Sequence, residues 1–426
     1  MKIGMLGQKG IPATYGGIER HVEELATRLV ERGHEVVVYC RPYYTKLGGE
    51  YRGIKLVNIP SIRTKHLDTA SHCAFAMPHI MAQNFDIVHF HALGPSLFAN
   101  LPRLRGAKSV VTVHGLDWQR EKWGAFATWI LKKCEYTSAN FPDRTIVVSK
   151  ALREHFRTVH ERYVTYIPNG TVLPHVRKAD KITEMGLTPG NYILFVGRLV
   201  PEKGCHYLLD AYRKIDTDVE LVIAGGTSFS TEYVDSLHEK GDERVRFLGY
   251  VYGDVLDELY SNARVFVLPS DIEGLPIALL EAMSFGNCCL TSDIPENLEV
   301  IGDCGTTFRQ GDVDDLAVPG LIRGAFLEHA GPDGGHLGTF GRAGDGGHNV
   351  AAEGGPGLEE ETLLRVDIQP GAVGGEADVQ QGGDAGDEGA AEGRGAGDDD
   401  LRLVGRDKIQ HGASEVILLV VRQVRA

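Results

Sequence analysis

The feature that most constrains this chain is a twice-repeated alternation of short β-rich runs and helical segments within the first 317 residues. Such alternation is typical of βαβ units on a parallel sheet. The predicted strands are 2–6, 35–40, 54–59, 86–91, 109–114 and 145–148 in the first series, and 192–196, 220–224, 244–248, 265–268 and 287–290 in the second. We therefore predict two doubly wound α/β domains. Ligands of such sheets bind at the carboxyl ends of the strands, so we expect the site in a cleft between the domains.

The domain boundaries follow from this alternation and from composition. We predict a Rossmann-like domain over 1–170, a polar linker over 171–190, a second and incomplete Rossmann-like domain over 191–317, and a tail over 318–426. The tail holds 25 of the 53 glycines, with 9 Lys+Arg against 19 Asp+Glu. A segment of this composition buries too little apolar surface to offset its chain entropy.

Two interpretations of the tail stay open. One is a natural acidic, flexible extension. The other is that the reading frame was lost near Ala317, so that the tail is a frame-shift product. We favour the second, because the change is abrupt and interrupts 311–317, which has the pattern of a helix start. Resequencing the coding DNA distinguishes them.

Charge and cysteine content exclude several classes of protein. The formal net charge is −14, from 44 Lys+Arg and 58 Asp+Glu, which argues against a nucleic-acid partner. The seven cysteines are odd in number and include no C-x-x-C, so a disulfide framework and a zinc ribbon are not expected. We find neither a signal-peptide pattern nor an apolar run long enough to span a bilayer, and we expect a cytoplasmic protein.

The first strand leads into a glycine-rich loop, 7–17, that opens a helix. A helix N-terminus favours an anion, and Gly16 and Gly17 would let the backbone approach a phosphate closely. The spacing is not G-x-G-x-x-G, so a nicotinamide cofactor is disfavoured. A simple turn that needs positive φ is the alternative.

Histidines end two of the predicted strands. His114 falls at a strand end, where it could bind a sugar hydroxyl or stabilise leaving-group charge; a structural histidine is the alternative. His89 and His91 share one face of another strand, but two histidines make no complete metal site. We predict no metal.

Two motifs of the second half carry charged side chains. In the loop 197–204, Arg198 and Lys203 could converge on a pyrophosphate, unless they are ordinary solvated cations. In 269–283, Glu273 lies in a loop, free to reach a polyol, and Glu281 lies inside the following helix among apolar residues. A carboxylate there needs a partner, which a ribose diol would supply; an ion pair with an arginine is the alternative. Backbone N–H groups between them could hold phosphate.

These motifs occur together in one order, and the chain from residue 1 to about 317 resembles a retaining GT-B glycosyltransferase of family 4. That group includes bacterial polysaccharide and lipopolysaccharide sugar transferases. The resemblance rests on E-x7-E, on G-R-L-x-P-E-K-G, on Ile167-Pro168-Asn169-Gly170, on His114-Gly115 and on the opening loop with Gly16-Gly17-Ile18-Glu19. The loop 10–17 is most similar to members that build bacterial surface polysaccharides.

The resemblance implies a role for each matching residue. The catalytic group would be Glu273, His114, Arg198 and Lys203, with Glu273 and His114 facing the donor sugar and the two cations neutralising the diphosphate. The donor-binding residues would be Gly16, Gly17, Arg198, Lys203, Val251, Glu273, Gly274, Leu275, Pro276 and Glu281, with Glu281 on the ribose and the base near Val251. Such enzymes generally need no metal and no other cofactor.

The implied function is transfer of a hexose from a nucleotide sugar to a saccharide or lipid-linked acceptor bound mainly by the first domain. The segment 118–133 mixes three tryptophans with basic residues, and is either an interfacial helix for peripheral contact with the inner face of the plasma membrane or an ordinary core helix. The alternatives are a sugar-nucleotide epimerase, a sugar-phosphate-directed synthase, and an inactive nucleotide-sugar-binding remnant, because the tail lacks the helices with which family members finish the second domain.

Overall fold

The computed structural model describes residues 1–120, 123–172, 174–226 and 231–317, all of which belong to one compact unit. The predictions for 318–426, the acidic tail and the frame-shift product, lie outside the described residues. Of the segment 118–133, residues 121–122 lie outside them as well.

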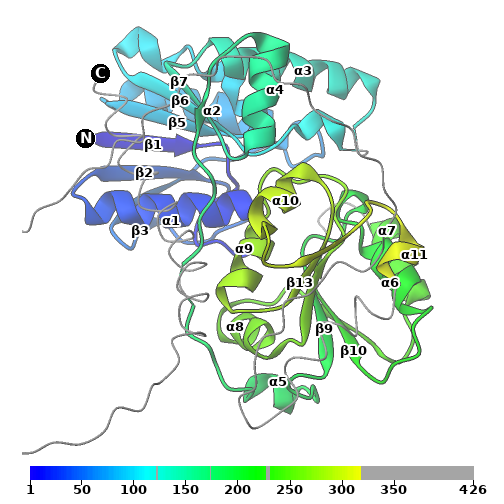
Figure 1. The fold of residues 1–426 in the computed structure, drawn as a ribbon. Coiled ribbons are helices and arrows are strands. Elements are labelled where there is room, and N and C mark those ends of the chain that lie inside the picture. Colours follow the sequence, from blue (N-terminus) through cyan, green and yellow to red (C-terminus); the bar gives the residue numbers. More distant parts are fainter. Residues whose placement is uncertain (121–122, 173, 227–230, 318–426) are drawn as a thin grey trace, which may run out of the picture. The chain divides into compact units, whose positions relative to one another are not determined.

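The N-terminal half forms an eight-stranded sheet in the order β3-β4-β2-β1-β5-β6-β7-β8, in which only the β3–β4 pair is antiparallel (Figure 1). The strands are β1 (Lys2–Leu6), β2 (Glu35–Cys40), β3 (Gly49–Tyr51), β4 (Ile54–Asn58), β5 (Ile87–His91), β6 (Lys108–Val113), β7 (Arg144–Val147) and β8 (Thr165–Tyr166).

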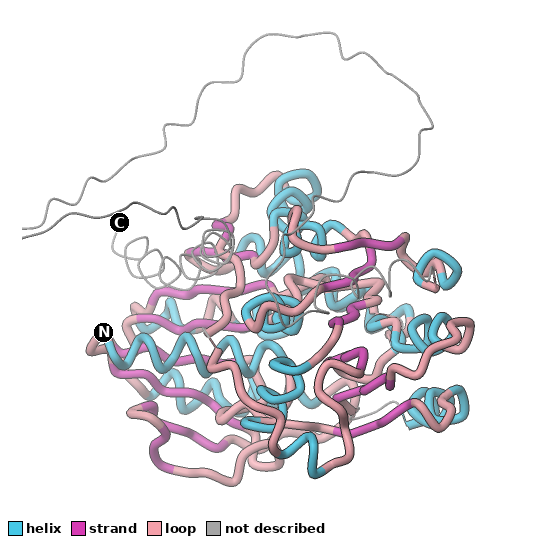
Figure 2. The backbone as a smooth tube through the Cα atoms, turned by 60° about the horizontal axis from the view of Figure 1, so that its bottom comes forward, coloured by secondary structure: helices cyan, strands magenta, loops and turns pink. Residues whose placement is uncertain are grey.

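Helices cover both faces of this sheet. The helices are α1 (Gly17–Glu31), α2 (Asp68–Ala82), α3 (Ala125–Asn140) and α4 (Lys150–His160), with 3-10 turns η1 (Gly94–Phe98), η2 (Pro102–Arg105) and η3 (Asp117–Gln119). The helix α1 runs alongside the strands (Figure 2) and packs its apolar stripe on one face. The helices α2, α3 and α4 pack on the other face. Apolar residues three and four positions apart in α1 produce this one-sided burial.

The second half forms a wholly parallel six-stranded sheet in the order β11-β10-β9-β12-β13-β14. Its strands are β9 (Tyr192–Val196), β10 (Glu220–Ala224), β11 (Val245–Gly249), β12 (Val265–Leu268), β13 (Cys289–Ser292) and β14 (Thr306–Phe308). Its helices are α5 (Lys181–Glu184), η4 (Pro201–Lys203), α6 (Cys205–Tyr212), α7 (Thr231–Lys240), α8 (Gly253–Asn262), α9 (Ile277–Ser284), α10 (Pro295–Ile301) and α11 (Val313–Leu316). The prediction of two doubly wound Rossmann-like domains is confirmed.

The two sheets are joined by packed side chains and hydrogen bonds. Leu275 and Leu280 of the second half belong to the core cluster of the first sheet. The Glu299 carboxylate of α10 accepts hydrogen bonds from the Tyr166 hydroxyl at 2.6 Å and from the Lys150 backbone N–H at 2.8 Å. These contacts hold the carboxyl edges of the two sheets together.

Some local features differ from the sequence prediction. The short strands β3 and β14 were not predicted, because three residues carry too little periodicity to stand out. The helix α5 lies inside 171–190, and its Ile182 is buried. The predicted helix start at 311–317 is confirmed by α11, whose N-cap carboxylate, on Asp312, accepts hydrogen bonds from two backbone N–H groups.

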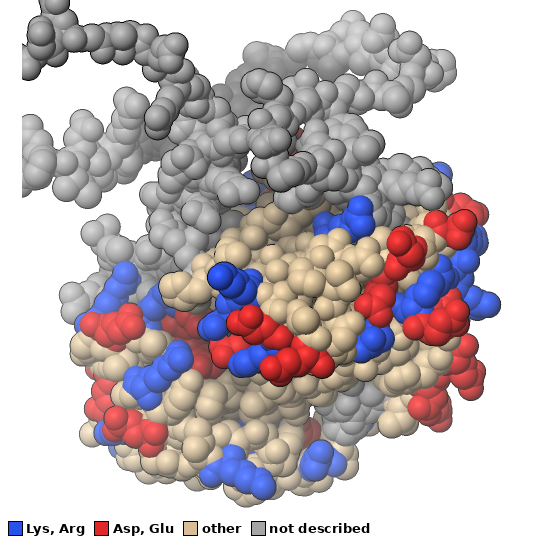
Figure 3. Space-filling view, turned by 90° about the horizontal axis from the view of Figure 1, so that it is seen from below, with Lys and Arg blue, Asp and Glu red and all other residues tan. Residues whose placement is uncertain are grey.

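The surface carries charge of both signs (Figure 3), and the cysteines are free thiols. On the face that carries α5 and α8, acidic and basic side chains are interspersed (Figure 3), and Arg177 forms ion pairs there with Asp254 and Asp257. The seven cysteines form no disulfide within the described residues. No helix in the described part of the chain is both long and apolar enough to cross a bilayer.

Candidate active site

The loop that follows β9 presents Arg198. Arg198 is partly buried, and its guanidinium makes no hydrogen bond or ion pair with any described residue. Burial, together with the nearby Arg120, lowers the pKa of Arg198, while Glu202, Glu273 and Glu19 oppose that shift. A desolvated cation without a counterion is a site for an anionic ligand.

Lys203 ends the short turn η4 and forms an ion pair with Glu273. The same Glu273 oxygen, Oε1, accepts a hydrogen bond from the Ser270 hydroxyl at 2.8 Å. The prediction that Glu273 is free in its loop is therefore wrong: a carboxylate of which only 7% is exposed needs compensating partners, and Lys203 and Ser270 provide them. Burial lowers the pKa of Lys203, and Glu273 opposes the shift. Lys203 is mostly buried and paired, so it is not an ordinary solvated cation, whereas Arg198 is only partly buried.

The N-terminus of α1 lies beside the start of α9. Gly16, the N-cap, has a φ of 104°, and a Cβ there would lie 2.0 Å from a carboxylate oxygen of Glu19. A Cβ on Gly17 would lie 3.4 Å from the Ile277 side chain. No side chain of the described residues caps the α1 N-terminus, so its first N–H groups are available to a ligand.

His114 directly follows β6 and contacts the loop that precedes α9. A Cβ at Gly274 would lie 1.8 Å from the His114 carbonyl oxygen, so only glycine permits this approach. His114 Nε2 lies 3.2 Å from His91 Nδ1, within hydrogen-bond distance. Burial, with His21 and His89 nearby, holds the pKa of His114 well below its usual range. His114 is therefore a neutral imidazole at the edge of the cleft.

Two groups within the described residues have metal-ligand chemistry. In the first, one nitrogen each of His21, His91 and His114 lie within 4.8 Å of one another. In the second, Glu135 Oε1 accepts hydrogen bonds from His155 at 2.7 Å and from His160 at 2.5 Å. His21 was not predicted, because α1 joins the strand-end histidines only in the folded chain. Both groups contain hydrogen bonds of their own, as structural polar networks do.

Glu281 is the fifth residue of α9. It lines a pocket together with Arg20, His21, Glu24, Leu25, Arg28, Pro168, Gly170, Thr171, Val172 and Ile277. Its carboxylate accepts a hydrogen bond from the Tyr260 hydroxyl at 3.3 Å and lies 3.9 Å from Arg20 Nε. Burial raises the pKa of Glu281. The alternative prediction, an ion pair of Glu281 with an arginine, is thus present only as a long contact with Arg20. The carboxylate can still accept hydrogen bonds from a ligand in the pocket.

The remaining predicted residues are arranged around these groups. The Leu275 carbonyl accepts a hydrogen bond of 2.9 Å from the Asn169 amide, which belongs to the motif at 167–170. Pro276 precedes the first residue of α9. Val251 follows β11 and is partly buried; no hydrogen bond or ion pair joins it to the other predicted residues in the described part of the chain. Ten of the predicted residues therefore lie at or near the facing strand ends and helix starts, while Val251 packs against the hydrophobic core of the second sheet.

Comparison with known proteins identifies the family. Residues 15–173 match Glycosyltransferase Family 4, and residues 180–318 match the glycosyl transferases group 1. An uncharacterised glycosyltransferase of Methanocaldococcus jannaschii is 31% identical over 325 residues, which cover 71% of this chain and 83% of that protein. The chain belongs to the group 1 glycosyltransferases. It is an enzyme of the GT-B fold.

Other similar proteins are diverse in what they make. The alpha-maltose-1-phosphate synthase of Mycobacterium tuberculosis is 28% identical to this glycosyltransferase over 329 residues, covering 71% of this chain and 82% of that one. The sucrose-phosphate synthase of Thermosynechococcus elongatus has a similar fold, with a TM-score of 0.66 at 22% identity, covering 77% and 90% of the two chains. The Anabaena protein HepE, solved with UDP-glucose, has a TM-score of 0.64 at 19% identity over 77% and 90%.

Several residues of the glycosyltransferase site could not be predicted from the sequence. Ser270 and Tyr260 reach the two glutamates through the fold, and a lone Ser or Tyr is not diagnostic. Glu19 was part of a quoted motif, yet its role was not predicted: its carboxylate accepts the Lys9 backbone N–H at 2.9 Å. The i+3 spacing from Gly16 to Glu19 was the available clue.

The segment 118–133 of the glycosyltransferase was predicted to be either an interfacial helix or a core helix, and its described residues show features of both. Trp118 is partly buried and donates a hydrogen bond of 2.5 Å to Glu135, as in a core element. In α3, Phe126 and Trp129 are 74% and 57% exposed. Within the described part of this segment, the exposed large apolar side chains are Phe126, Trp129 and Ile130, all in the first half of α3.

Proposed function

We propose that this enzyme transfers a hexose from a nucleoside diphosphate sugar to a saccharide or lipid-linked acceptor, with retention of anomeric configuration, in the synthesis of a bacterial surface polysaccharide. The observation that carries the donor class is Arg198, a desolvated cation with no counterion among the described residues. A diphosphate leaving group supplies the missing negative charge.

In this proposal, Arg198 binds the diphosphate and Lys203 adds a second cation, which Glu273 holds in place. The uncapped N-terminus of α1, at Gly16 and Gly17, donates backbone N–H groups to the same diphosphate. The bond from the anomeric carbon to the diphosphate oxygen breaks while the acceptor oxygen attacks the same face and gives its proton to the departing phosphate. Charge stabilisation and positioning then carry catalysis.

The remaining residues orient the donor. Glu281 accepts hydrogen bonds from the ribose diol within its pocket, and neutral His114 hydrogen-bonds the donor sugar. Glu273 Oε2 has no hydrogen-bond partner among the described residues and is left to contact the sugar hydroxyls. No metal has a step in this scheme, because fixed cations and a helix N-terminus take the charge.

A donor panel tests the proposal. Purified protein is mixed with UDP-, GDP- and dTDP-sugars, and stabilisation is scored by thermal shift and slow turnover by donor hydrolysis. One nucleotide series is expected to raise the melting temperature and to be hydrolysed. The absence of binding by every donor would contradict the proposal, and binding without turnover would favour the inactive remnant. Production of a free epimerised sugar would favour an epimerase.

A sugar phosphate is the second candidate acceptor. It is supported by two of the similar proteins, which are a maltose-1-phosphate synthase and a sucrose-phosphate synthase. A soluble phosphorylated disaccharide as product distinguishes it from a lipid-linked acceptor.

We also propose peripheral contact with an anionic bilayer through the start of α3. Phe126 and Trp129 are exposed, and Lys132 and Lys133 lie on the same helix. This combination is typical of interfacial helices. Sedimentation with phosphatidylglycerol vesicles is expected for the wild type and reduced for the double variant F126S/W129S, and equal sedimentation of both would refute it.

A further inference from the structure

The glycine-rich loop after β1 holds Lys9, which is, after Arg198, a second cation of the site without a counterion among the described residues. Its backbone is fixed on both sides: its N–H donates to Glu19 at 2.9 Å, and its carbonyl accepts from the Arg41 backbone N–H at 2.7 Å. Its ammonium group lies 4.4 Å from the centre of the Tyr15 ring. It makes no hydrogen bond or ion pair with any residue that the structure describes. Burial lowers the pKa of Lys9, although Glu19 opposes the shift.

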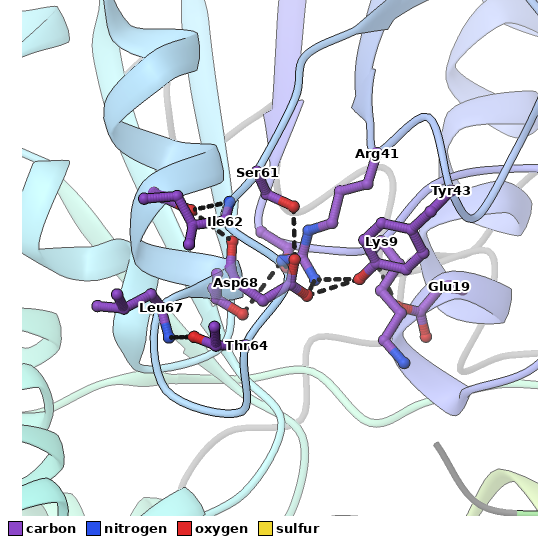
Figure 4. A network of polar contacts seen from close by, with 12 residues as sticks. Lys9, Glu19, Arg41, Tyr43, Ser61, Ile62, Thr64, Leu67 and Asp68 are labelled. Carbon is purple, nitrogen blue, oxygen red and sulfur yellow. Dashed lines mark hydrogen bonds and ion pairs between the residues drawn. The ribbon is translucent and has the colours of Figure 1, made fainter. Parts of the chain in front are cut away.

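The acidic groups around Lys9 are already engaged. Asp68 binds Arg41 at 2.6 Å and accepts hydrogen bonds from the Tyr43 hydroxyl at 2.6 Å and the Ser61 hydroxyl at 2.5 Å. Figure 4 shows this network with Lys9 beside it, its ammonium group pointing away from Asp68. The buried Arg41–Asp68 pair neutralises itself, so it does not compensate the charge of Lys9.

Further positive charge lies beside the same network. The Arg63 guanidinium lies 4.8 Å from the centre of the Tyr43 ring and forms no ion pair with a described residue. Lys65, two residues on, is exposed and also forms none. This edge of the first sheet is therefore cationic in a chain whose net charge is −14. It is complementary to an anionic ligand.

We infer that the Lys9 ammonium group binds a phosphate on the acceptor. This rests on the proposed function, in which the acceptor occupies the first domain. The donor diphosphate already has Arg198, Lys203 and the N-terminus of α1, which leaves the charge of Lys9, although it lies near Arg198, for a second anionic group. A compact ammonium charge whose backbone is fixed suits a phosphate oxygen. The phosphate belongs either to a sugar phosphate or to the diphosphate of a lipid-linked saccharide.

Binding to the UDP-loaded enzyme tests the inference without requiring turnover. The probes are glucose, glucose 1-phosphate, glucose 6-phosphate and farnesyl-diphosphate-linked N-acetylglucosamine, and each Kd is measured by calorimetry. The variants are K9Q and the charge-preserving K9R, with K46Q, at an exposed lysine of the same domain, as the matched control. Melting temperatures establish that each variant is folded.

We expect at least one phosphorylated probe to bind more tightly than glucose, and K9Q to weaken it by about 10- to 100-fold, as the loss of a charge-assisted hydrogen bond would. K46Q should change its Kd by less than about threefold, and K9R, which keeps the charge, should bind more tightly than K9Q. Tighter binding of a sugar phosphate or of the prenyl-linked probe shows which of the two acceptors supplies the phosphate.

Three results would overturn the inference: no preference for phosphorylated probes, equal Kd values for K9Q and wild type, or an equal loss of UDP affinity in K9Q, which would place Lys9 on the donor. Failure of the wild type to bind UDP, or whichever nucleotide the donor panel selects, would instead refute the proposed function.

Discussion

The two halves of the cleft each present a lysine from a strand-to-helix loop, but they differ in how its charge is compensated. Lys203 of the second half is paired with Glu273, which Ser270 also holds. Lys9 of the first half forms no ion pair within the described residues: its ammonium group lies 4.4 Å from the centre of the Tyr15 ring, and the carboxylates of Glu19 and Asp68 act on it only at longer range. The pair fixes the position of Lys203 in advance, as a catalytic cation needs. The unpaired lysine retains its full charge for a ligand whose identity it helps to select.

The largest effect should come from breaking the Lys203–Glu273 pair. We expect K203M to lower the free energy of unfolding by about 3 kcal/mol, because it leaves Glu273 with an uncompensated, buried charge. K9M, which leaves no such partner, should cost less than about 1 kcal/mol. Urea unfolding of both variants measures the contrast.

The double variant K203M/E273Q is the control for that contrast. It should recover part of the stability lost in K203M, since the lone charge is gone. Equal destabilisation by K9M and K203M would show that the two lysines are not differently compensated, and the comparison would fail.

A smaller effect is expected at Glu281. E281Q keeps the size of the side chain but weakens the acceptance of ribose hydroxyls, so the donor KM should rise about 10- to 50-fold. With the wild type, a 2′-deoxyribose donor should have a higher KM than the ribose donor, whereas with E281Q the two donors should have nearly the same KM. If removal of the 2′-hydroxyl raised KM by the same factor in both enzymes, Glu281 would not contact the ribose.

The smallest effect at neutral pH concerns the buried histidines, whose contribution appears only as the pH falls. Burial lowers the pKa of His89 to about 3, and its Nε2 lies 2.7 Å from the Thr112 hydroxyl. The unfolded chain takes up a proton below about pH 6.5 whereas the folded chain does not, so the stability contributed by neutral His89 is complete above that pH and is lost as the pH falls from 6.5 toward 3.

H89Q should flatten this loss between pH 6 and pH 4 by about 1.4 kcal/mol per pH unit. H175Q, at an exposed histidine, should leave the slope unchanged. Chemical denaturation at several pH values provides the measurement, and identical slopes for H89Q and wild type would be the contrary result.

The sequence predicted what local patterns encode. The strands β1, β2, β9, β10 and β12 have the predicted bounds, because their apolar β-branched runs end at glycines or polar loops. The site motifs were also found, since each combines a strand end with a loop and a helix start. The family resemblance then supplied roles that spacing alone does not.

Pairings between distant residues could not be predicted. Lys203 and Glu273 are 70 positions apart, and nothing local marks either one as the partner of the other. His21 joins His91 and His114 only because α1 packs beside the ends of β5 and β6. The unpaired state of Lys9 and Arg198 is likewise a property of the folded chain, for it depends on where every nearby carboxylate points.

The central claim is that Arg198 is the diphosphate receptor of the donor site. The most direct test is calorimetry of UDP and of uridine, or the corresponding pair for the nucleotide selected by the donor panel, with wild type, R198A and the exposed-site control R213A. We expect the diphosphate to improve wild-type and R213A affinity by about 100-fold, and R198A to lose most of that gain while uridine affinity stays constant. An undiminished diphosphate preference in R198A would contradict the account.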